Sequence, residues 1–317
     1  MKKALAYLLL LVIFPLGSCL DGVDSDLEQT IERDDRLLKE FLERNEIQAI
    51  ETPLGYYYVK EVESSGSNQI VNNDIVGVYY EIRTINGQLI ESYLDESKSP
   101  RIFKHTEEGL VPKAINFATG LSKEGEVFTL YVPSYLAYQD YSFQQLILPN
   151  SNLEIKVKYA KIFSEEATKE MEEEMISNYI AENELLGFER TEEGMYIRIV
   201  NTTNEGTPAK NGDIVGFTFA LNQLNETSPI AEGTNAANPT QISLGNASNL
   251  KFLNLSMEGL TNNTEFEVLV PSHLGFGITT QVFPFQIRRD LFQNAYIPQV
   301  ARPFEPLFFK AKIVDIN

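Results

Sequence analysis

The sequence predicts an α+β protein made of two copies of one unit, each an amphipathic helix followed by an antiparallel sheet wrapped on a short helix. Three observations predict this architecture. Matching motifs recur at a nearly constant spacing, the apolar period is helical before each copy, and within each copy it changes to the alternation of strands. Gly194 follows Gly55 by 139 positions, whereas solenoid repeats are roughly 20 to 50 residues long, so the unit is a duplicated domain.

The duplication is carried by three pairs of matching segments. The first two pairs are 139 residues apart, and the third separation is one residue shorter. The pairs are Gly55–Tyr58 with Gly194–Ile197, Asn73–Gly77 with Gly212–Gly216, and Val132–Leu136 with Val270–Leu274. Differences between two copies of one domain are therefore informative about function.

The first 18 residues are interpreted as a lipoprotein signal peptide. Two lysines precede an apolar run from Ala4 to Phe14, which is too short to span a bilayer comfortably but suits the core of a signal peptide. Leu16–Cys19 then resembles the lipobox of bacterial lipoproteins, in which the cysteine becomes the lipidated first residue. We expect a lipid-anchored protein of the bacterial cell envelope, on the outer membrane, with the periplasmic and the surface face both left open.

Composition argues against several classes of partner. With 45 acidic and 26 basic side chains the net charge is −19, so phosphate backbones should be repelled and nucleic acid is not expected as a partner. Two histidines and one cysteine leave no recognisable zinc or haem site. We also find no phosphate-binding glycine loop and no nucleophile elbow. Neither a metal nor a cofactor is expected.

Each copy is predicted to begin with a helix. An acidic tether and N-terminal helix are expected over 19–50, and a linker helix over 164–190, with Ser164 as its N-cap. The apolar residues at helical spacing are Leu27, Ile31, Leu38, Phe41 and Leu42 in the first helix, and Met171, Met175, Ile176, Tyr179 and Ile180 in the second.

Strand patterns follow in domain 1, predicted over 51–163, and in domain 2, predicted over 191–317. In domain 1 the expected strands are rich in β-branched and aromatic residues, and they are Tyr56–Val59, Ile75–Ile82, Glu126–Val132 and Leu153–Tyr159. Asn86-Gly87 favours a two-residue hairpin because both residues tolerate positive φ. A short helix is expected between Pro112 and Gly120.

In order and spacing, residues Tyr56 to Ile162 resemble the FKBP-type peptidyl-prolyl cis-trans isomerases. The matching segments are the Gly-aromatic first strand, Asn73-Asp74 before Ile75–Tyr80, the hairpin to Glu91, Leu110–Pro112, Gly120-Leu121, Val132–Tyr138 and Leu148–Leu153. The N-terminal helix is similar to that of exported isomerases of Gram-negative bacteria. The resemblance implies two tandem FKBP-like half-barrels, the second degenerate, and a pocket between sheet and short helix that binds proline-containing polypeptides.

The same resemblance implies which residues form the site of domain 1. Tyr80 and Tyr138 stand at the positions of two pocket tyrosines, and Glu91 stands where the family usually carries Asp. Together these three are the candidate catalytic residues. The candidate substrate-binding residues are Ile90, Phe103, Val111, Ala114, Ile147 and Ile155.

Two departures from the family pattern affect the expected activity. Ala114 falls where the pocket floor is usually Trp, and the whole chain contains no Trp, so a deeper or partly collapsed pocket and weak turnover are expected. In domain 2, Phe219 and Phe276 replace the two tyrosines, and Pro229-Ile230 stands where Ile90-Glu91 stood. Domain 2 is therefore expected to be inactive.

Domain 2 also has a longer loop before its last strand, over 277–304. Pro133 and Leu153 are 20 positions apart, whereas Pro271 and Leu307 are 36 positions apart. A long apolar loop in a compact domain is usually functional or forms an interface with a protein partner. The alternative, that it folds back over its own core, stays open at this stage.

Two functional hypotheses remain from the sequence. The first is a prolyl isomerase and folding helper of the cell envelope, with a non-catalytic domain 2. The second is a peptide-binding or scaffold lipoprotein of envelope assembly in which neither domain turns over substrate. A carbohydrate-binding lipoprotein is less favoured, because such sites usually show exposed Trp, which the chain lacks.

Overall fold

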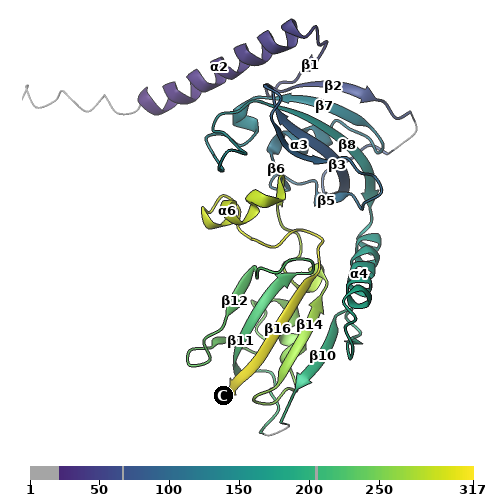
Figure 1. Ribbon diagram of the computed structural model, residues 1–317, viewed down its shortest axis with the longest axis vertical. Coiled ribbons are helices and arrows are strands. Elements are labelled where there is room, and N and C mark those ends of the chain that lie inside the picture. Colours follow the sequence, from purple (N-terminus) through teal and green to yellow (C-terminus); the bar gives the residue numbers. More distant parts are fainter. Residues whose placement is uncertain (1–20, 66–67, 204–205) are drawn as a thin grey trace, which may run out of the picture.

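The computed structural model describes residues 21–65, 68–203 and 206–317, and its two seven-stranded sheets lie one above the other in Figure 1. The predicted signal peptide and Cys19 lie outside the described residues. Both sheets are antiparallel, and each packs against one short helix, so the α+β fold class predicted from the sequence is confirmed. In the described part of the chain, no helix combines the length and the apolar character needed to cross a membrane.

The first sheet has the strand order β1-β2-β7-β8-β3-β4, and β5 pairs with β3. Its alternating apolar side chains enclose helix α3 (Lys113–Thr119) and form the core of domain 1. The strands are β1 (Ile50–Glu51), β2 (Tyr57–Val62), β3 (Ile75–Thr84), β4 (Leu89–Tyr93), β5 (Arg101–Lys104), β7 (Val127–Val132) and β8 (Leu153–Phe163).

The second sheet repeats that order as β9-β10-β14-β16-β11-β12, with β13 paired to β11. Helix α5 (Lys251–Met257) takes the place of α3. The two sheets therefore share one strand order, as well as the repeated motifs of the sequence. The strands are β9 (Glu189–Arg190), β10 (Tyr196–Asn201), β11 (Ile214–Gln223), β12 (Ala231–Gly233), β13 (Thr240–Ser243), β14 (Glu265–Val270) and β16 (Leu307–Ile316).

The helices that precede the two sheets dock on them through the same kind of contact. On α2 (Asp21–Arg44), buried Asp34 accepts hydrogen bonds from the backbone N–H and the hydroxyl of Ser134, at 2.9 and 2.6 Å. On α4 (Glu165–Glu182), buried Glu172 accepts the same pair from Ser272, at 2.5 and 2.6 Å. Each serine opens a 3-10 turn, η1 (Ser134–Leu136) or η2 (Ser272–Leu274).

Of two local predictions, the helix N-cap at Ser164 is confirmed and the hairpin type is not. Ser164 caps α4 as predicted, accepting from the Ala167 N–H at 3.1 Å. The two-residue hairpin at Asn86-Gly87 is wrong. The Thr84 N–H bonds to the Gln88 carbonyl, which closes a three-residue loop, and only Gly87 of the predicted pair has a positive φ, +90°. A three-residue hairpin needs one such residue, and glycine adopts that conformation at little steric cost.

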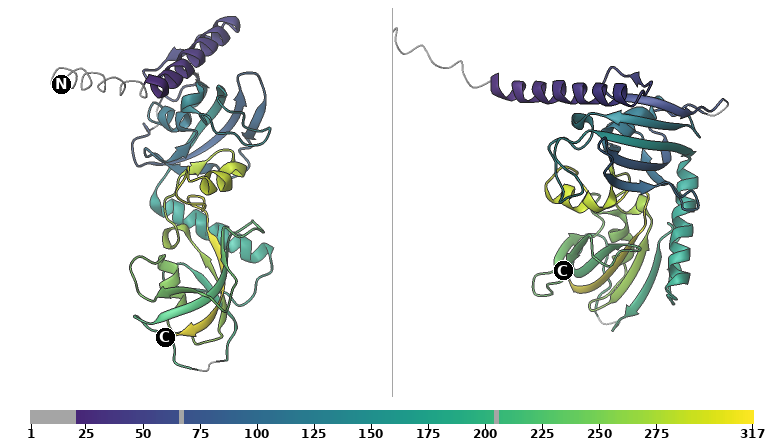
Figure 2. Two further views of the ribbon diagram at one scale, coloured as in Figure 1. Left: turned by 90° about the vertical axis from the view of Figure 1, so that its left-hand side faces the viewer. Right: turned by 45° about the horizontal axis from the view of Figure 1, so that its top comes forward.

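The long loop of domain 2 does not lie on its own sheet. Figures 1 and 2 show it, in yellow-green, between the two sheets and against domain 1. It contains β15 (Gln281–Val282), η3 (Phe285–Ile287) and α6 (Arg288–Gln293). Strand β15 pairs in parallel with β6 (Leu110–Val111) of domain 1. The peptide bonds Val111–Pro112 and Phe283–Pro284 are cis.

Candidate functional site: the pocket of domain 1

The structure brings the predicted site residues of domain 1 together. Tyr80 and Tyr138 belong to one buried apolar cluster, and Glu91 is hydrogen-bonded to Tyr80. Five of the six predicted wall residues are members of this cluster and Val111 packs against it. The wall residues come from β4 (Ile90), β5 (Phe103), β6 (Val111), α3 (Ala114), the segment before β8 (Ile147) and β8 itself (Ile155). Their roles in binding or turnover stay predictions.

Two phenol hydroxyls and one carboxylate are the predicted polar groups of this pocket, and each hydroxyl has a hydrogen-bond acceptor. The Tyr80 hydroxyl donates to the Glu91 carboxylate at 2.5 Å. Burial raises the pKa of the Tyr80 hydroxyl far above its usual range, and the neighbouring Glu91 charge adds to the effect. Burial likewise raises the pKa of the Tyr138 hydroxyl. Both phenols therefore remain protonated hydrogen-bond donors at neutral pH.

The pocket is occupied by a side chain of domain 2. Phe283 of the domain 2 loop joins the same buried cluster and is fully buried. Its ring stacks on Tyr80, with the ring centroids 3.8 Å apart. Ala114 is itself fully buried, and a small residue at this floor leaves volume that an aromatic ring from elsewhere can fill.

The main chain of the loop is held as well as its side chain. The N–H of Gln281 donates to the Gly109 carbonyl, and the N–H of Phe283 donates to the Val111 carbonyl, both at 2.9 Å. On the other side, the Tyr138 hydroxyl donates to the Phe283 carbonyl at 2.7 Å. The candidate catalytic hydroxyl thus binds a backbone carbonyl that directly precedes a proline.

Further contacts hold the loop at the rim of the pocket. The Arg101 guanidinium lies 3.3 Å from the centroid of the Phe285 ring. The Tyr141 hydroxyl donates to the Asp290 carboxylate at 2.7 Å, and the Tyr141 ring meets Tyr296 edge to face. A cavity of about 290 Å³ remains between domain 1 and the loop, lined in part by Tyr138 and Ile297.

The loop has its own internal support. Arg288 is 4% exposed and donates to the carbonyls of Thr280 and Val300 at 2.6 and 2.7 Å. Burial lowers the pKa of its guanidinium to about 10, so it stays charged at neutral pH and bridges both arms of the loop. The loop that carries Phe283 is therefore stabilised by hydrogen bonds of its own.

Domain 2 fills the corresponding space with its own side chains. The second residue of the short helix is Ala114 in α3 but Phe252 in α5. The Phe309 ring contacts Phe252 at a centroid distance of 5.1 Å and Phe219 at 5.8 Å. Phe219, Phe276 and Ile230, which stand in place of Tyr80, Tyr138 and Glu91, all pack on this core. These side chains carry no hydroxyl or carboxylate.

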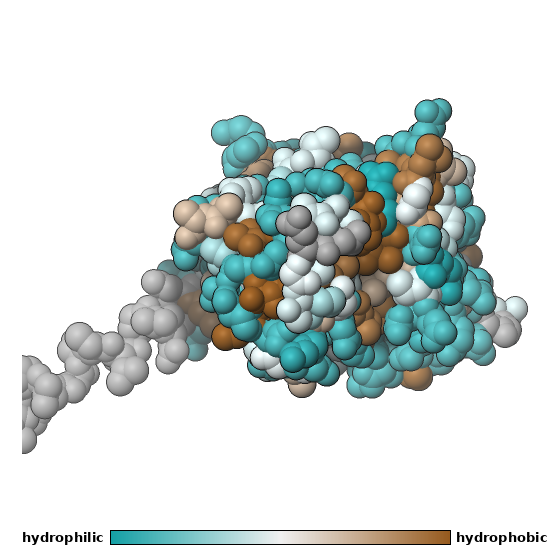
Figure 3. All heavy atoms as spheres, turned by 90° about the horizontal axis from the view of Figure 1, so that it is seen from below, coloured by the Kyte–Doolittle hydropathy of each residue, from teal (hydrophilic) through white to brown (hydrophobic). Residues whose placement is uncertain are grey.

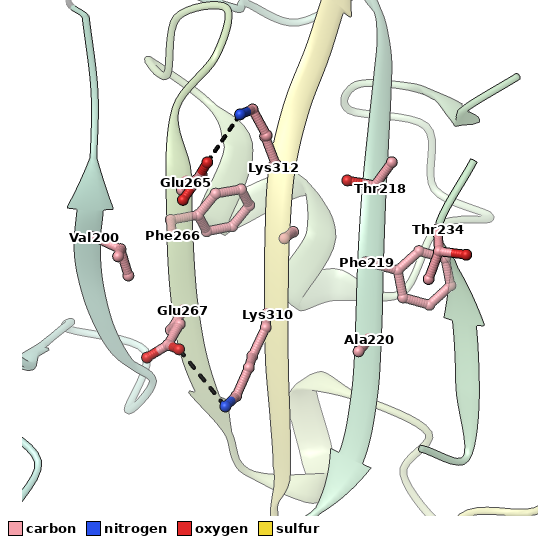
Figure 4. A pocket seen from close by; sticks show the side chains of 11 residues that line it. Val200, Thr218, Phe219, Ala220, Thr234, Glu265, Phe266, Glu267, Lys310 and Lys312 are labelled. Atoms are coloured by element: carbon pink, nitrogen blue, oxygen red, sulfur yellow. Dashed lines mark hydrogen bonds and ion pairs between the residues drawn. The ribbon is translucent and has the colours of Figure 1, made fainter. Parts of the chain in front are cut away.

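The other face of the second sheet offers no better candidate site. A shallow depression of about 360 Å³ lies there (Figure 4), where Lys312 pairs with Glu265 at 2.9 Å and Lys310 with Glu267 at 3.8 Å. The end of the molecule formed by domain 2 mixes hydrophilic and hydrophobic areas (Figure 3). Across the described residues, no cluster of three or more His, Cys, Asp or Glu side chains is placed to bind a metal ion.

The geometry of domain 1 agrees with comparisons to known proteins. Residues 66–160 match the family model of the FKBP-type peptidyl-prolyl cis-trans isomerases, so the chain contains a domain of that family. The chain is 30% identical over 138 residues to a probable FKBP-type peptidyl-prolyl cis-trans isomerase, FkpA, of Neisseria meningitidis serogroup B. That match covers 44% of this chain and 48% of the relative, so the chain spans about half the length of that relative.

Two solved structures match the chain at low TM-score. The three FKBP domains of wheat FKBP73 match with a TM-score of 0.32 and 13% identity, covering 84% of this chain and 96% of that one. FkpA of Escherichia coli matches with a TM-score of 0.35 and 22% identity, covering 44% of this chain and 63% of that one.

Sequence reasoning missed Phe283 as a residue of the domain 1 pocket. The signals were present separately: an alanine where the family has a large aromatic floor, and a lengthened loop with the segment Val282–Phe285. The sequence left open whether that loop meets a partner or covers its own core. The structure shows that it contacts domain 1 of the same chain.

Proposed function

We propose that domain 1 is a peptidyl-prolyl cis-trans isomerase that assists protein folding in the bacterial cell envelope, anchored through a lipidated Cys19. One observation carries the proposal: the hydroxyl of Tyr138 donates to the carbonyl before a proline, inside an apolar pocket shared with Tyr80 and Glu91. The family match of residues 66–160 supports the same reaction.

The chemistry requires neither a nucleophile nor a metal. Rotation about an X–Pro amide is opposed by a barrier of about 18–20 kcal/mol, which comes from resonance between the carbonyl and the nitrogen. The planar, resonance-stabilised amide is more polar than the twisted one, so a pocket that excludes water disfavours the planar form. The buried walls around Phe103 and Ile155 provide that environment.

Each polar group has a defined task in this mechanism. Tyr138 donates to the carbonyl of the residue before the proline and holds one side of the rotating bond, as it does for Phe283. The Tyr80 hydroxyl is committed to Glu91, so the pair orients the Tyr80 ring as a wall of the pocket. Since both phenols remain protonated at neutral pH, the Tyr138 hydroxyl is available as a hydrogen-bond donor at that pH.

The competing function is that of a non-catalytic peptide-binding or scaffold lipoprotein, which is favoured by the occupied pocket and the missing aromatic floor at Ala114. In either function, domain 2 serves as a non-catalytic module. Its counterpart residues lack the hydroxyls and the carboxylate, and its interior is filled by its own phenylalanines.

Isomerase assays with pocket variants separate the two functions. Residues 20–317, which hold every described element, would be assayed with a short X–Pro peptide. The wild type would be compared with the variant Phe283→Ala, in which the pocket is vacated. Tyr138→Phe and Glu91→Ala should each lower the rate. Tyr79→Phe is the matched control, because its hydroxyl donates to the Lys98 carbonyl outside the pocket. A rate that stays at the uncatalysed value in both backgrounds favours the scaffold.

The anchoring part of the proposal has its own test. Two or more acyl chains give stable membrane attachment, whereas a single chain is marginal. In a bacterial host, the full chain should incorporate labelled fatty acid and sediment with membranes, and Cys19→Ser should abolish both. Labelling that persists in the Cys19→Ser variant would contradict the anchor.

A further inference from the structure

We propose that the loop segment Gln281–Phe285 of domain 2 is a tethered ligand of domain 1, which occupies the peptide-binding pocket as a client segment would and must be displaced before a client binds. The inference rests on the proposed function in one respect, that this pocket is where proline-containing segments bind. It also specifies the ligand: an extended segment with an aromatic residue directly before proline.

The main-chain contacts of the segment are ones that any extended peptide can make. The N–H of Phe283 donates to the Val111 carbonyl and its carbonyl accepts from Tyr138, so this residue is fixed from both sides through backbone atoms. The N–H of Gln281 adds one further bond, to Gly109, which extends the parallel pairing of β15 with β6. Pairing of this kind gives affinity with little dependence on sequence.

Side-chain contacts supply the selectivity. The Phe283 ring is fully buried and stacks on Tyr80. Ala114 at the helix start leaves space that domain 2 fills with Phe252, so this pocket accepts a larger ring than one with an aromatic floor would. The rim contact of Arg101 with Phe285 favours a second aromatic after the proline. The preferred ligand is therefore aromatic-Pro-aromatic.

The arrangement regulates access because the ligand is covalently attached. A tethered segment acts at an effective concentration on the order of millimolar, so a free peptide at micromolar concentration competes poorly. The apparent affinity for a free peptide is reduced by the fraction of molecules whose pocket is open. Weakening the loop anchor raises that fraction without altering the pocket itself.

The decisive experiment measures binding of the segment as a separate peptide. A fluorescein-labelled peptide with the sequence of residues 281–286, Gln-Val-Phe-Pro-Phe-Gln, would be titrated by anisotropy with residues 20–317. We expect Phe283→Ala to bind it at least about tenfold more tightly than the wild type. Phe292→Ala is the matched control, since Phe292 lies on the same loop and is 40% exposed, and its affinity should equal that of the wild type.

A measurement on the unmutated chain covers the case in which Phe283→Ala does not fold. Saturating peptide should speed hydrogen exchange at the amides of Gln281 and Phe283, which are bonded to domain 1, while those of β16 in the domain 2 core stay protected. The proposal is overturned if wild type and Phe283→Ala bind the peptide equally, or if excess peptide leaves loop exchange unchanged.

Failure of this inference can be distinguished from failure of the proposed function. If Phe283→Ala binds the peptide tightly yet does not accelerate X–Pro isomerisation, the tethered ligand stands and the isomerase fails. If wild type and Phe283→Ala both isomerise above the uncatalysed rate, at equal rates, and bind the peptide equally, the isomerase stands and the tethered ligand is wrong.

Discussion

The two domains share one strand order but differ in what fills the space between sheet and short helix. Domain 2 closes that space with its own phenylalanines, including Phe252 at the start of α5 and Phe309 on β16. Domain 1 has Ala114 and Ile155 at the matching places, and its space is filled by Phe283 from the domain 2 loop. The interior of domain 2 is thus filled by its own side chains, whereas that of domain 1 is filled by a side chain of domain 2.

This difference bears on whether the interior of each domain can open without loss of core packing. An interior filled by residues of its own sheet and helix cannot open without loss of core packing. A pocket filled by a loop from another domain can open while both sheets stay intact. The polar residues follow the same division, because Tyr138 and the Tyr80–Glu91 pair occur only in the copy that is filled by the loop of the other domain.

The largest expected effect tests whether Phe309 is a core residue. Phe309→Ala should destabilise the chain by about 3–5 kcal/mol, because it removes a ring that is 1% exposed and packed among other phenylalanines. Urea unfolding followed by far-UV circular dichroism measures the loss. Phe292→Ala, at an exposed position of the long loop, is the control. A loss near that of the control would mean that domain 2 does not depend on its aromatic core.

The second prediction gives domain 1 the floor residue of domain 2. Ala114→Phe places a ring in space now shared with Phe283, so overpacking of about 1–3 kcal/mol should expel the loop. Hydrogen exchange over residues 281–285 should become faster while β8 stays protected. Ala236→Phe makes the same change in an exposed loop of domain 2 and should leave exchange over 281–285 unchanged. Unaltered loop protection in Ala114→Phe would show that the two rings do not compete.

Much of the fold could be predicted because its determinants are local or repeated. Helical spacing located α2 and α4, and alternation located β2, β3, β7 and β8 within a few residues. The hairpin at Asn86-Gly87 was assigned the wrong length, since loop length depends on the register of β3 with β4. The acidic run Glu172–Glu174 predicts a solvated face, which is wrong for Glu172, since its side chain is buried. The contacts of Asp34 and Glu172 could not be predicted, because their partners Ser134 and Ser272 lie 100 positions further along the chain.

The residues of the candidate site could be predicted from the sequence, but the occupation of the pocket by Phe283 could not. The spacing of Tyr80, Glu91 and Tyr138 placed them in one pocket through resemblance, and the structure places them there. What fills the pocket depends on how two domains pack, and no periodicity in the sequence encodes that. The position of Phe283 follows from the tertiary course of a loop that begins more than 130 residues after Tyr138.

The third prediction concerns the hydroxyl of Tyr138, which domain 2 lacks because Phe276 stands in its place. Tyr138→Phe should weaken the docking of the loop by about 0.5–1.5 kcal/mol, because the carbonyl of Phe283 loses its donor. Exchange at the Phe283 amide should accelerate accordingly. Tyr79→Phe, one residue before Tyr80, should not change it. Equal protection in Tyr138→Phe would show that the stacked ring and the β15–β6 pairing hold the loop without the phenol.

The smallest expected effect comes from the two buried carboxylates that dock the preceding helices. Asp34 pairs with the neighbouring Arg33 as well as with Ser134, whereas among the described residues no basic side chain pairs with Glu172. Burial accordingly raises the pKa of the Glu172 carboxyl above its ordinary value, and the hydrogen bonds from Ser272 offset only part of that effect. The folded state therefore binds this proton more tightly than the unfolded state does.

A group of this kind stabilises the fold fully below its unfolded pKa and loses that contribution as pH rises through the higher folded pKa. The free energy of unfolding of the wild type, minus that of Glu172→Gln, should therefore decrease as pH is raised from about 4 toward neutral. Urea unfolding at a series of pH values measures the difference, with Glu170→Gln on the exposed side of α4 as the control. A difference that stays constant or increases with pH would mean that burial does not raise the pKa of Glu172.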